Sequence, residues 1–248
     1  MESNIGTYSF LAEPSQMDFT GNLMLSVLGK HLLDSASMHA ADCGFGMTFL
    51  NENHYTWVLS RLAVECNELP GQNEAYSIDT WIESVLSSFS GRNFIIKNSK
   101  GKAIGYARSV WAMIDMESRR PVNLLTLRDG IMKKYIDTEK ECPINRPEKI
   151  FTRTCTPVEA VTVRYSDMDI NGHLNSIRYM EYILNLFPVE TFKKKRLKRF
   201  EISYLSEAVY GDILGIYHDS DETVGSHQIE MRKQTSGETA CKAKVIFV

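Results

Sequence analysis

The residue types best suited to chemistry in this chain are gathered in the stretch DMDINGHLN, residues 167–175. Asp169, Asn171 and His173 bring a carboxylate, a carboxamide and an imidazole together directly before residues 175–187, where apolar side chains recur at spacings of three and four. That spacing predicts a helix with one buried face. The unpaired backbone N–H groups at its start can hold an anion or polarise a carbonyl group. The stretch therefore has two interpretations, a helix cap or a reaction centre.

A second acidic residue, Glu207, favours the reaction centre. It stands among Leu205, Ala208 and Val209 on a segment whose pattern predicts a strand packed near the helix. Its side chain faces either solvent or a groove in which it meets His173. In the second arrangement, carboxylate, imidazole and carboxamide together can activate water and hold a developing oxyanion, as hydrolysis of an activated acyl group requires.

The elements that position these groups occur twice in the chain. Residues 18–23 (DFTGNL) align with residues 169–174 (DINGHL), and each stretch opens a helical pattern, over 24–44 and 175–187 respectively. Alternating apolar and polar residues, with glycine at the turns, predict antiparallel strands after each helix. We therefore predict an α+β fold in which each half packs one long helix against an antiparallel sheet. The predicted strand segments are 56–69, 74–86 and the hairpin 92–115, then 199–210, 212–220 and the hairpin 226–248.

The two halves differ at the positions that matter for chemistry. Thr20 and Asn22 stand where the second half has Asn171 and His173. Threonine and asparagine cap helices well, whereas only the imidazole exchanges a proton near neutral pH. The chemistry is therefore expected in the second half. The predicted division is an N-terminal domain over 1–135, a proline-containing linker region over 136–155 and a C-terminal domain over 156–248.

Composition excludes several classes of protein. The chain has 248 residues, is 43% hydrophobic and 24% charged, and carries a net charge of −3, which argues against a nucleic-acid partner. No apolar run approaches the roughly 20 residues needed to cross a bilayer, so no membrane association is expected. The N-terminal stretch lacks the features of a secretory signal, and we expect a cytoplasmic protein. The five cysteines are odd in number and without a C-x-x-C pair, which is typical of a reducing compartment: Cys43, Cys66, Cys142, Cys155 and Cys241.

Metal and nucleotide chemistry are also disfavoured. The histidines other than His173 lack the spacing of metal ligands, and no glycine-rich phosphate loop or G-x-S-x-G elbow occurs. We therefore predict neither a metal site nor a cofactor.

The sequence resembles the fatty acyl-[acyl-carrier-protein] thioesterases of the plant-chloroplast type, in a bacterial form without a transit peptide. The motif D-x-N-x-H-x-N is present as Asp169, Asn171, His173 and Asn175, and a second motif surrounds Glu207. Matching segments in the first half extend the likeness over almost the whole chain: Cys43–Gly46, Trp57–Leu62, Asp79–Trp81 and Arg108–Trp111.

The resemblance implies two fused hotdog domains, each a long helix wrapped by an antiparallel sheet. It implies hydrolysis of the thioester between a fatty acyl chain and the phosphopantetheine arm of acyl carrier protein, with Asp169, Asn171, His173 and Glu207 as the catalytic groups. It also implies that the acyl tail lies in the first hotdog, between helix and sheet. Many plant members carry a cysteine beside the catalytic glutamate, where this chain has Ala208, so we expect attack by water rather than a covalent acyl-enzyme.

In the expected mechanism Glu207, directly or through His173, accepts a proton from water, and which of the two is the base stays open. Asn171 positions the carbonyl group or the water, and Asp169 orients the loop or the histidine. Backbone N–H groups around Gly172–Asn175 stabilise the oxyanion, so Gly172 and Asn175 are predicted to bind substrate.

The predicted partner is an acyl carrier protein, and two interpretations of a basic run bear on its docking. Lys193, Lys194, Lys195 and Arg196 form either a solvated linker or a positive ledge that steers an acidic carrier. Three other functions remain open on the same fold: an acyl-CoA thioesterase, a non-catalytic acyl-binding module, or a hydratase. We expect a monomer or homodimer.

Overall fold

The computed structural model describes residues 4–153 and 156–248, so Cys155 lies outside the described residues. Contacts within the chain divide it into two compact units, residues up to 146 and residues 147–248. The boundary falls inside the segment predicted as a linker region, 136–155. The four described cysteines are buried, and none of them forms a disulfide with another. Within the described ranges, no helix combines the length and the apolar character that crossing a membrane requires.

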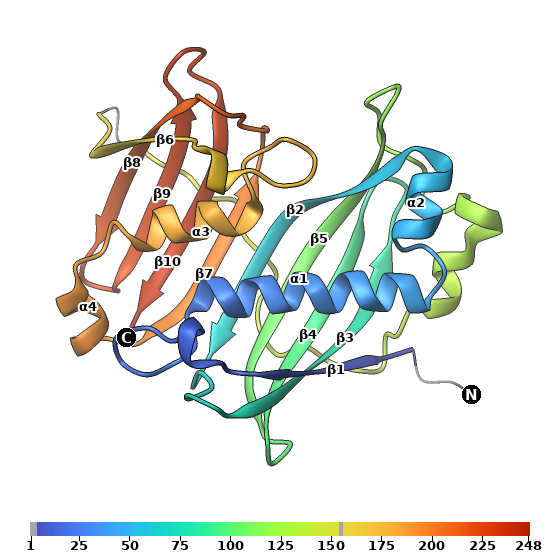
Figure 1. The fold of residues 1–248 in the computed structure, drawn as a ribbon, viewed down its shortest axis with the longest axis horizontal. Helices are drawn as coiled ribbons and strands as arrows, with labels where there is room; N and C mark the ends of the chain where they lie inside the picture. Colours follow the sequence, from blue (N-terminus) through green and yellow to red (C-terminus); the bar gives the residue numbers. More distant parts are fainter. Residues whose placement is uncertain (1–3, 154–155) are drawn as a thin grey trace. The chain divides into compact units, whose positions relative to one another are not determined.

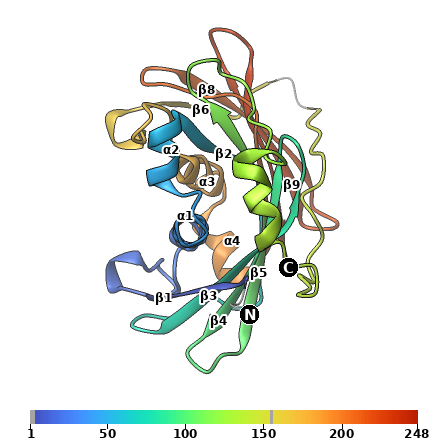
Figure 2. The same cartoon turned by 90° about the vertical axis from the view of Figure 1, so that its right-hand side faces the viewer.

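The first unit packs one long helix on an antiparallel sheet, as its sequence predicts. Helix α1 (Leu25–Asp42) lies along one face of the strands, and Figure 2 views it end-on. Its buried side includes Leu28 and Leu32, both fully inaccessible to solvent, and small residues such as Ala36 that let the helix lie close to the strands. The strands follow the order β1 (Gly6–Leu11), β3 (Ala75–Val85), β4 (Ser90–Asn98), β5 (Ala103–Asp115) and β2 (Tyr55–Cys66) (Figure 1).

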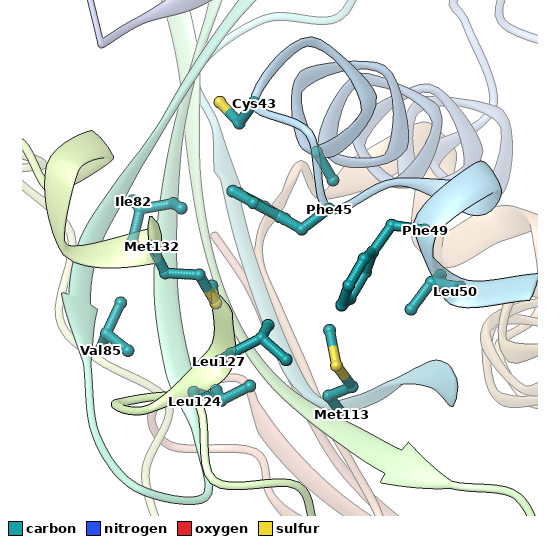
Figure 3. Packing of buried hydrophobic residues seen from close by; sticks show 11 residues of the cluster. Cys43, Phe45, Phe49, Leu50, Ile82, Val85, Met113, Leu124, Leu127 and Met132 are labelled. Carbon is teal, nitrogen blue, oxygen red and sulfur yellow. The ribbon is translucent and has the colours of Figure 1, made fainter. Parts of the chain in front are cut away.

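A separate apolar cluster lies beyond the C-terminal end of α1. Figure 3 shows Phe45 and Phe49 converging on Met113 of β5 and on Leu124 and Met132. Phe49 belongs to helix α2 (Met47–Asn53), which Phe45 precedes. Met132 belongs to the 3₁₀ segment η2 (Leu127–Tyr135), which Leu124 precedes. The cluster holds the irregular segments after β5 against the sheet.

The face of the sheet that packs on α1 was expected to form an apolar wall for an acyl chain. It also contains a buried charged residue, Arg92. Arg92 of β4 donates to His39 Nδ1 at 2.8 Å and to Thr80 Oγ1 at 3.1 Å. Burial, together with the positive charge of Arg92, lowers the pKa of His39 to about 4. The imidazole is therefore neutral, and its Nδ1 accepts the guanidinium hydrogen bond.

Residues 136–146 are anchored to the first unit rather than forming a free linker. Cys142 and Ile144 pack on Trp81, which is fully buried. Arg108 donates to the carbonyl oxygens of Ile144 and Cys142 at 2.8 and 2.7 Å. Lys140 reaches the Asp79 carboxylate at 2.8 Å. These contacts hold the segment on the face of the sheet opposite α1.

The second unit repeats the arrangement with a shorter helix. Helix α3 (Ser176–Leu184) has 9 residues, against 18 in α1, so the predicted helix over 175–187 is too long. Pro188 disfavours the helical conformation at residue 187. The regular helix has already ended by then, because the Leu186 and Phe187 N–H groups turn back to the Ile183 and Leu184 carbonyls. A short helix, α4 (Val189–Lys194), follows. The strands follow the order β7 (Leu197–Tyr204), β10 (Thr239–Phe247), β9 (Ser226–Lys233), β8 (Ile213–Asp221) and β6 (Glu159–Thr162) (Figure 1).

Glu230 of β9 centres a polar network in the second unit. It accepts hydrogen bonds from Arg232 at 2.8 Å, Thr239 at 2.6 Å and the Thr152 hydroxyl, and it pairs with Lys242 at 3.3 Å. Burial alone would raise the pKa of Glu230, but these donors outweigh it and lower the pKa to about 2. The carboxylate therefore fixes the segment that enters the second unit to β9 and β10.

We expect Glu230→Gln to lower the free energy of unfolding by about 1–3 kcal/mol, because it removes charge-assisted hydrogen bonds from a buried carboxylate. Since the folded-state pKa is depressed from 4.5 to about 2, the stabilisation is complete above the unfolded value and is lost as pH falls through that window. Urea unfolding at pH 7 and at pH 3 measures both effects. Glu238→Gln is the matched control, since that side chain is 54% exposed and its ion pair with Lys233 lies at the surface. Equal losses in the two variants would contradict the role of the network.

Candidate active site

The turn that carries the predicted site is shaped by Asp169. Its Oδ1 accepts the backbone N–H groups of Asn171 at 2.9 Å and His173 at 3.0 Å. Its own N–H donates to the His173 carbonyl at 2.8 Å, and the Gly172 N–H returns to the Asp169 carbonyl at 3.1 Å. Gly172 has φ +77°, a conformation that residues with a Cβ rarely adopt. Asp169 thus holds the loop in shape, and its expected part in catalysis stays a prediction.

The first unit contains the same turn, which confirms the repeat found in the sequence. Asp18 Oδ1 accepts the N–H groups of Thr20 at 2.8 Å and Asn22 at 3.3 Å, and the Asp18 N–H donates to the Asn22 carbonyl at 2.8 Å. Gly21 has φ +80°. An aspartate at this position therefore builds the turn whether or not a histidine follows it.

The structure brings His173 and Glu207 together. His173 Nε2 lies 3.2 Å from Glu207 Oε2, and the two side chains are 26% and 45% exposed. The Leu174 N–H donates to the Ala208 carbonyl at 2.7 Å, which joins the turn to the segment that carries the glutamate. Both functional groups are thus in contact with each other and accessible to water.

Glu207 lies on a loop, not on the predicted strand. The segment predicted as a strand over 199–210 ends at Tyr204, the last residue of β7. Leu205 and Val209 are 57% and 45% exposed, whereas Ala208 is fully buried. The alternating side chains resemble a strand in sequence, but the chain leaves the sheet there.

The corresponding loop of the first unit lacks both groups. The Leu23 N–H donates to the Pro70 carbonyl at 2.8 Å, as the Leu174 N–H does to Ala208. That correspondence places Leu69 where the second unit has Glu207. In place of His173, Asn22 donates back to Thr20 Oγ1 at 2.8 Å. The acid–imidazole pair is therefore specific to the second unit, as the asymmetry between the two halves predicts.

The remaining predicted residues have structural parts in the turn. The Asn175 side chain accepts from the Ile177 N–H at 2.8 Å and so caps α3. Gly172 is exposed and supplies the left-handed backbone. Asn171 is also exposed, and its backbone N–H is bonded to Asp169. Contact of Asn171, Gly172 or Asn175 with a substrate stays a prediction.

One expectation needs correction. Backbone N–H groups of Gly172–Asn175 were expected to hold an oxyanion, but each already donates within the protein: Gly172 and His173 to Asp169, Leu174 to Ala208, and Asn175 to the Asp167 carbonyl. Committed donors cannot also bind an oxyanion without breaking these bonds. In this turn the exposed amide of Asn171 is the donor better placed to meet a substrate.

Asp167 is a site residue that the sequence reasoning did not single out. It is buried, and its Oδ2 accepts from the Arg164 N–H at 2.7 Å and the Tyr182 hydroxyl at 2.8 Å. Burial and the Asp167 hydrogen bond raise the pKa of Tyr182 to about 12, so the phenol remains a donor. Asp167 therefore ties the turn to α3, and its place within DMDINGHLN was the available signal.

No cluster of three or more potential metal ligands occurs among residues 4–153 and 156–248. The described site thus consists of a carboxylate, an imidazole and a nearby carboxamide.

Comparisons with known proteins match the same family over almost the whole chain. The profile of the acyl-ACP thioesterase N-terminal domain matches residues 7–135, and that of the C-terminal domain matches residues 153–248. The crystal structure of an acyl-ACP thioesterase from Bacteroides thetaiotaomicron is 48% identical, with a TM-score of 0.92 over 99% of this chain and 98% of that one. The 12:0-ACP thioesterase from Umbellularia californica, 16% identical with a TM-score of 0.84 over 100% of this chain and 98% of that one, shares the fold.

Curated plant relatives are more distant. The dodecanoyl-[acyl-carrier-protein] hydrolase of Cinnamomum camphora is 26% identical over 75% of this chain and 51% of its own length. The oleoyl-acyl carrier protein thioesterase of Coriandrum sativum is 26% identical over 78% and 54%. The chain thus spans about half the length of these relatives. Two domain profiles in order and a 48% identical structure over its full length show the double hotdog fold, and the chain belongs to the acyl-ACP thioesterase family.

Proposed function

We propose that this protein hydrolyses the thioester between a fatty acyl chain and acyl carrier protein, releasing the free fatty acid and ending chain elongation. The observation that carries the proposal is the 3.2 Å contact between His173 Nε2 and Glu207 Oε2, with both side chains accessible to water. The family supports the substrate class, because its named relatives are hydrolases or thioesterases of carrier-bound acyl groups.

Glu207 is the general base in this proposal. It is the more exposed of the two groups, at 45% against 26% for His173, so water reaches it more readily. An N–H on His173 Nε2 then donates to Oε2 and fixes the carboxylate, while Asp169 holds the backbone from which the ring projects. Glu207 fits the geometry of a base better than His173 does, because the Nε2 atom of His173 is already occupied by its contact with Glu207.

The chemical step follows from that arrangement. Glu207 takes a proton from water as the water oxygen bonds to the thioester carbon, and the Asn171 amide donates to the carbonyl oxygen as negative charge develops there. The C–S bond then breaks, and the proton returns from Glu207 to the sulfur. A thiolate leaves more readily than hydroxide, because a thiol is a much stronger acid than water, so the attack on the carbonyl carbon is the step that most needs assistance.

Two other functions make different predictions for substrate. An acyl-CoA thioesterase would cleave a CoA thioester at least as fast as the carrier thioester with the same acyl chain. A non-catalytic acyl-binding module would release no thiol from either. Measuring free thiol from both thioesters separates the three.

The carrier is proposed to dock through Lys193, Lys194, Lys195 and Arg196, all of which are exposed. Lys193 pairs with Glu190 at 2.8 Å and Lys195 with Glu222 at 3.8 Å, and exposed pairs of this kind hold their charges only weakly. The run follows α3, whereas the His173 turn precedes it, and nine helical residues span about 13 Å. A carrier bound there would have to extend its substrate arm along the helix toward the turn.

Glu207→Gln should lower kcat for a carrier-bound acyl thioester by about 10²- to 10⁴-fold, because the amide cannot accept the proton of the attacking water. His173→Ala should lower it by about 10²-fold through loss of the group that orients the carboxylate. Release of free thiol at saturating substrate measures both. Glu238→Gln, an exposed acid in the same unit, is the control. Turnover close to wild type in both site variants would remove the proposed mechanism.

The paired turns allow a test that separates stability from catalysis. Gly172→Ala and Gly21→Ala both place a Cβ at φ near +80° with nothing within 4 Å, so each should cost about 1–2 kcal/mol of unfolding free energy from backbone strain alone. Only Gly172→Ala should also reduce kcat, since it displaces His173. The measurements are chemical unfolding and initial rates on the same preparations. A matching loss of kcat in Gly21→Ala would mean that the second turn has no special part in turnover.

Lys194→Glu should raise KM for the carrier thioester several-fold and weaken its dependence on salt, because one steering charge is reversed. The CoA thioester with the same acyl chain should show no change and serves as the control substrate. An unchanged KM for the carrier substrate across salt concentrations would favour the solvated linker.

A further inference from the structure

Two tyrosines brace the segments that carry His173 and Glu207. Tyr204 ends β7, three residues before Glu207, and its hydroxyl donates at 2.9 Å to the carbonyl of Ser176, three residues after His173. The bond from Leu174 to Ala208 is a second link between the same two segments. Glu207 therefore lies between the two residues, Tyr204 and Ala208, that tie its segment to the chain just after His173.

Tyr179, on the first turns of α3, completes the brace. It is buried, and its ring packs edge-on against that of Tyr204, with centroids 5.6 Å apart at 75°. Its hydroxyl interacts with the backbone N–H of Ala208, while the Ala208 carbonyl accepts from Leu174. The peptide groups on both sides of Ala208, directly after Glu207, are thus held. Burial raises the pKa of Tyr204 well above 10.0, so its hydroxyl keeps the proton that it donates.

The first unit serves as a comparison, because it has the same turn but has neither the histidine nor the glutamate. The chain leaves β2 as it leaves β7: the Asn67 N–H donates to the Ile104 carbonyl at 2.8 Å, and the Leu205 N–H donates to the Ala240 carbonyl at 2.9 Å. This alignment puts Cys66 at the position of Tyr204. The aligned turns put Leu28 at the position of Tyr179.

The residue of the first unit that corresponds to Ala208 also lacks the group that a tyrosine could contact. It is Pro70, which has a carbonyl for the shared backbone bond but no N–H for a tyrosine to meet. Both phenol groups, and the donor that one of them meets, therefore occur only in the unit that has the histidine and the glutamate. A brace needed for folding alone would be expected in both units.

We propose that Tyr204, together with Tyr179, is a positioning residue that fixes Glu207 against His173 during thioester hydrolysis. The proposal rests on the proposed function of that pair. A misplacement of about 1 Å at a reacting group can cost about 10²-fold in rate, so a single hydroxyl can affect turnover without touching the substrate.

The test is Tyr204→Phe in the full chain. The change removes one hydroxyl and keeps the ring that packs on Tyr179, so the midpoint of urea unfolding should shift only slightly. We expect kcat for the carrier thioester to fall about 10- to 100-fold with KM unchanged. Tyr217→Phe is the matched control, because it removes a phenol hydroxyl from β8, where the ring lies 4.1 Å from the Arg232 guanidinium. Its kcat should equal that of wild type.

A double variant distinguishes positioning from general damage. In a Glu207→Gln background, Tyr204→Phe should lower the residual single-turnover rate no further, since a residue acting through Glu207 has nothing left to position. Equal fractional losses in both backgrounds, or an unchanged kcat in Tyr204→Phe, would overturn the proposal. If Tyr204→Phe does not fold, Tyr179→Phe takes its place with the same expected outcomes. Normal turnover in Glu207→Gln itself would instead refute the proposed function, so the two failures are distinguishable.

Discussion

The arrangement of the site depends on one backbone hydrogen bond, from the Leu174 N–H to the Ala208 carbonyl at 2.7 Å. Leu174 directly follows His173, and Ala208 directly follows Glu207. The bond between Leu174 and Ala208 fixes the distance between the two backbone segments, which are far apart in sequence. Rotation of the two side chains is then enough to bring His173 Nε2 to Glu207 Oε2. An exposed ion pair would contribute little to holding the loops together, so this backbone bond must do so, with the bond from the Tyr204 hydroxyl to the Ser176 carbonyl beside it. The backbone bond that positions the histidine and the glutamate therefore involves neither of their side chains.

The first unit shows that this connection is independent of the chemistry. Leu23 and Pro70 make the same bond at 2.8 Å, and Asp18 builds the same turn, yet the side chains at the reactive positions are Asn22 and Leu69. One scaffold therefore exists twice, and the chemical groups are present once. Asp169 belongs with the scaffold by this comparison, although it lies in the same motif as His173. Its importance to turnover is expected to come through the shape of the loop and not through contact with substrate.

Much of the fold could be predicted because its signals are local. Alternating side chains and a glycine after Lys100 located the hairpin of β4 and β5, and an apolar face at helical spacing located α1. The predictions that were wrong depended on packing between distant residues or on how the chain turns. Helix α3 ends early ahead of Pro188, and Phe187 packs instead against His227 and Phe247. Strand β1 and the short β6 gave no pattern strong enough to notice.

The site was predictable to a different degree. The residue types were visible in the sequence, and the family resemblance supplied the pairing of His173 with Glu207. Which backbone N–H groups remain available could not be predicted, because that depends on how the turn folds back on Asp169 and on its bond to Ala208. The expected oxyanion site failed for this reason. The tyrosine brace also escaped notice, since Tyr204 and Tyr179 resemble ordinary core residues until their hydroxyl partners are known.

The loop that carries Glu207 also bears on the identity of the nucleophile. Ala208 is fully buried, while the side chain of the preceding residue, Glu207, is 45% exposed. A side chain at position 208 thus faces the core, away from the water-accessible carboxylate. A thiol at this position would be buried, and burial disfavours the charged thiolate. Burial at position 208 therefore argues against a covalent route from this position, and it supports the proposed attack by a water molecule on the exposed side of Glu207.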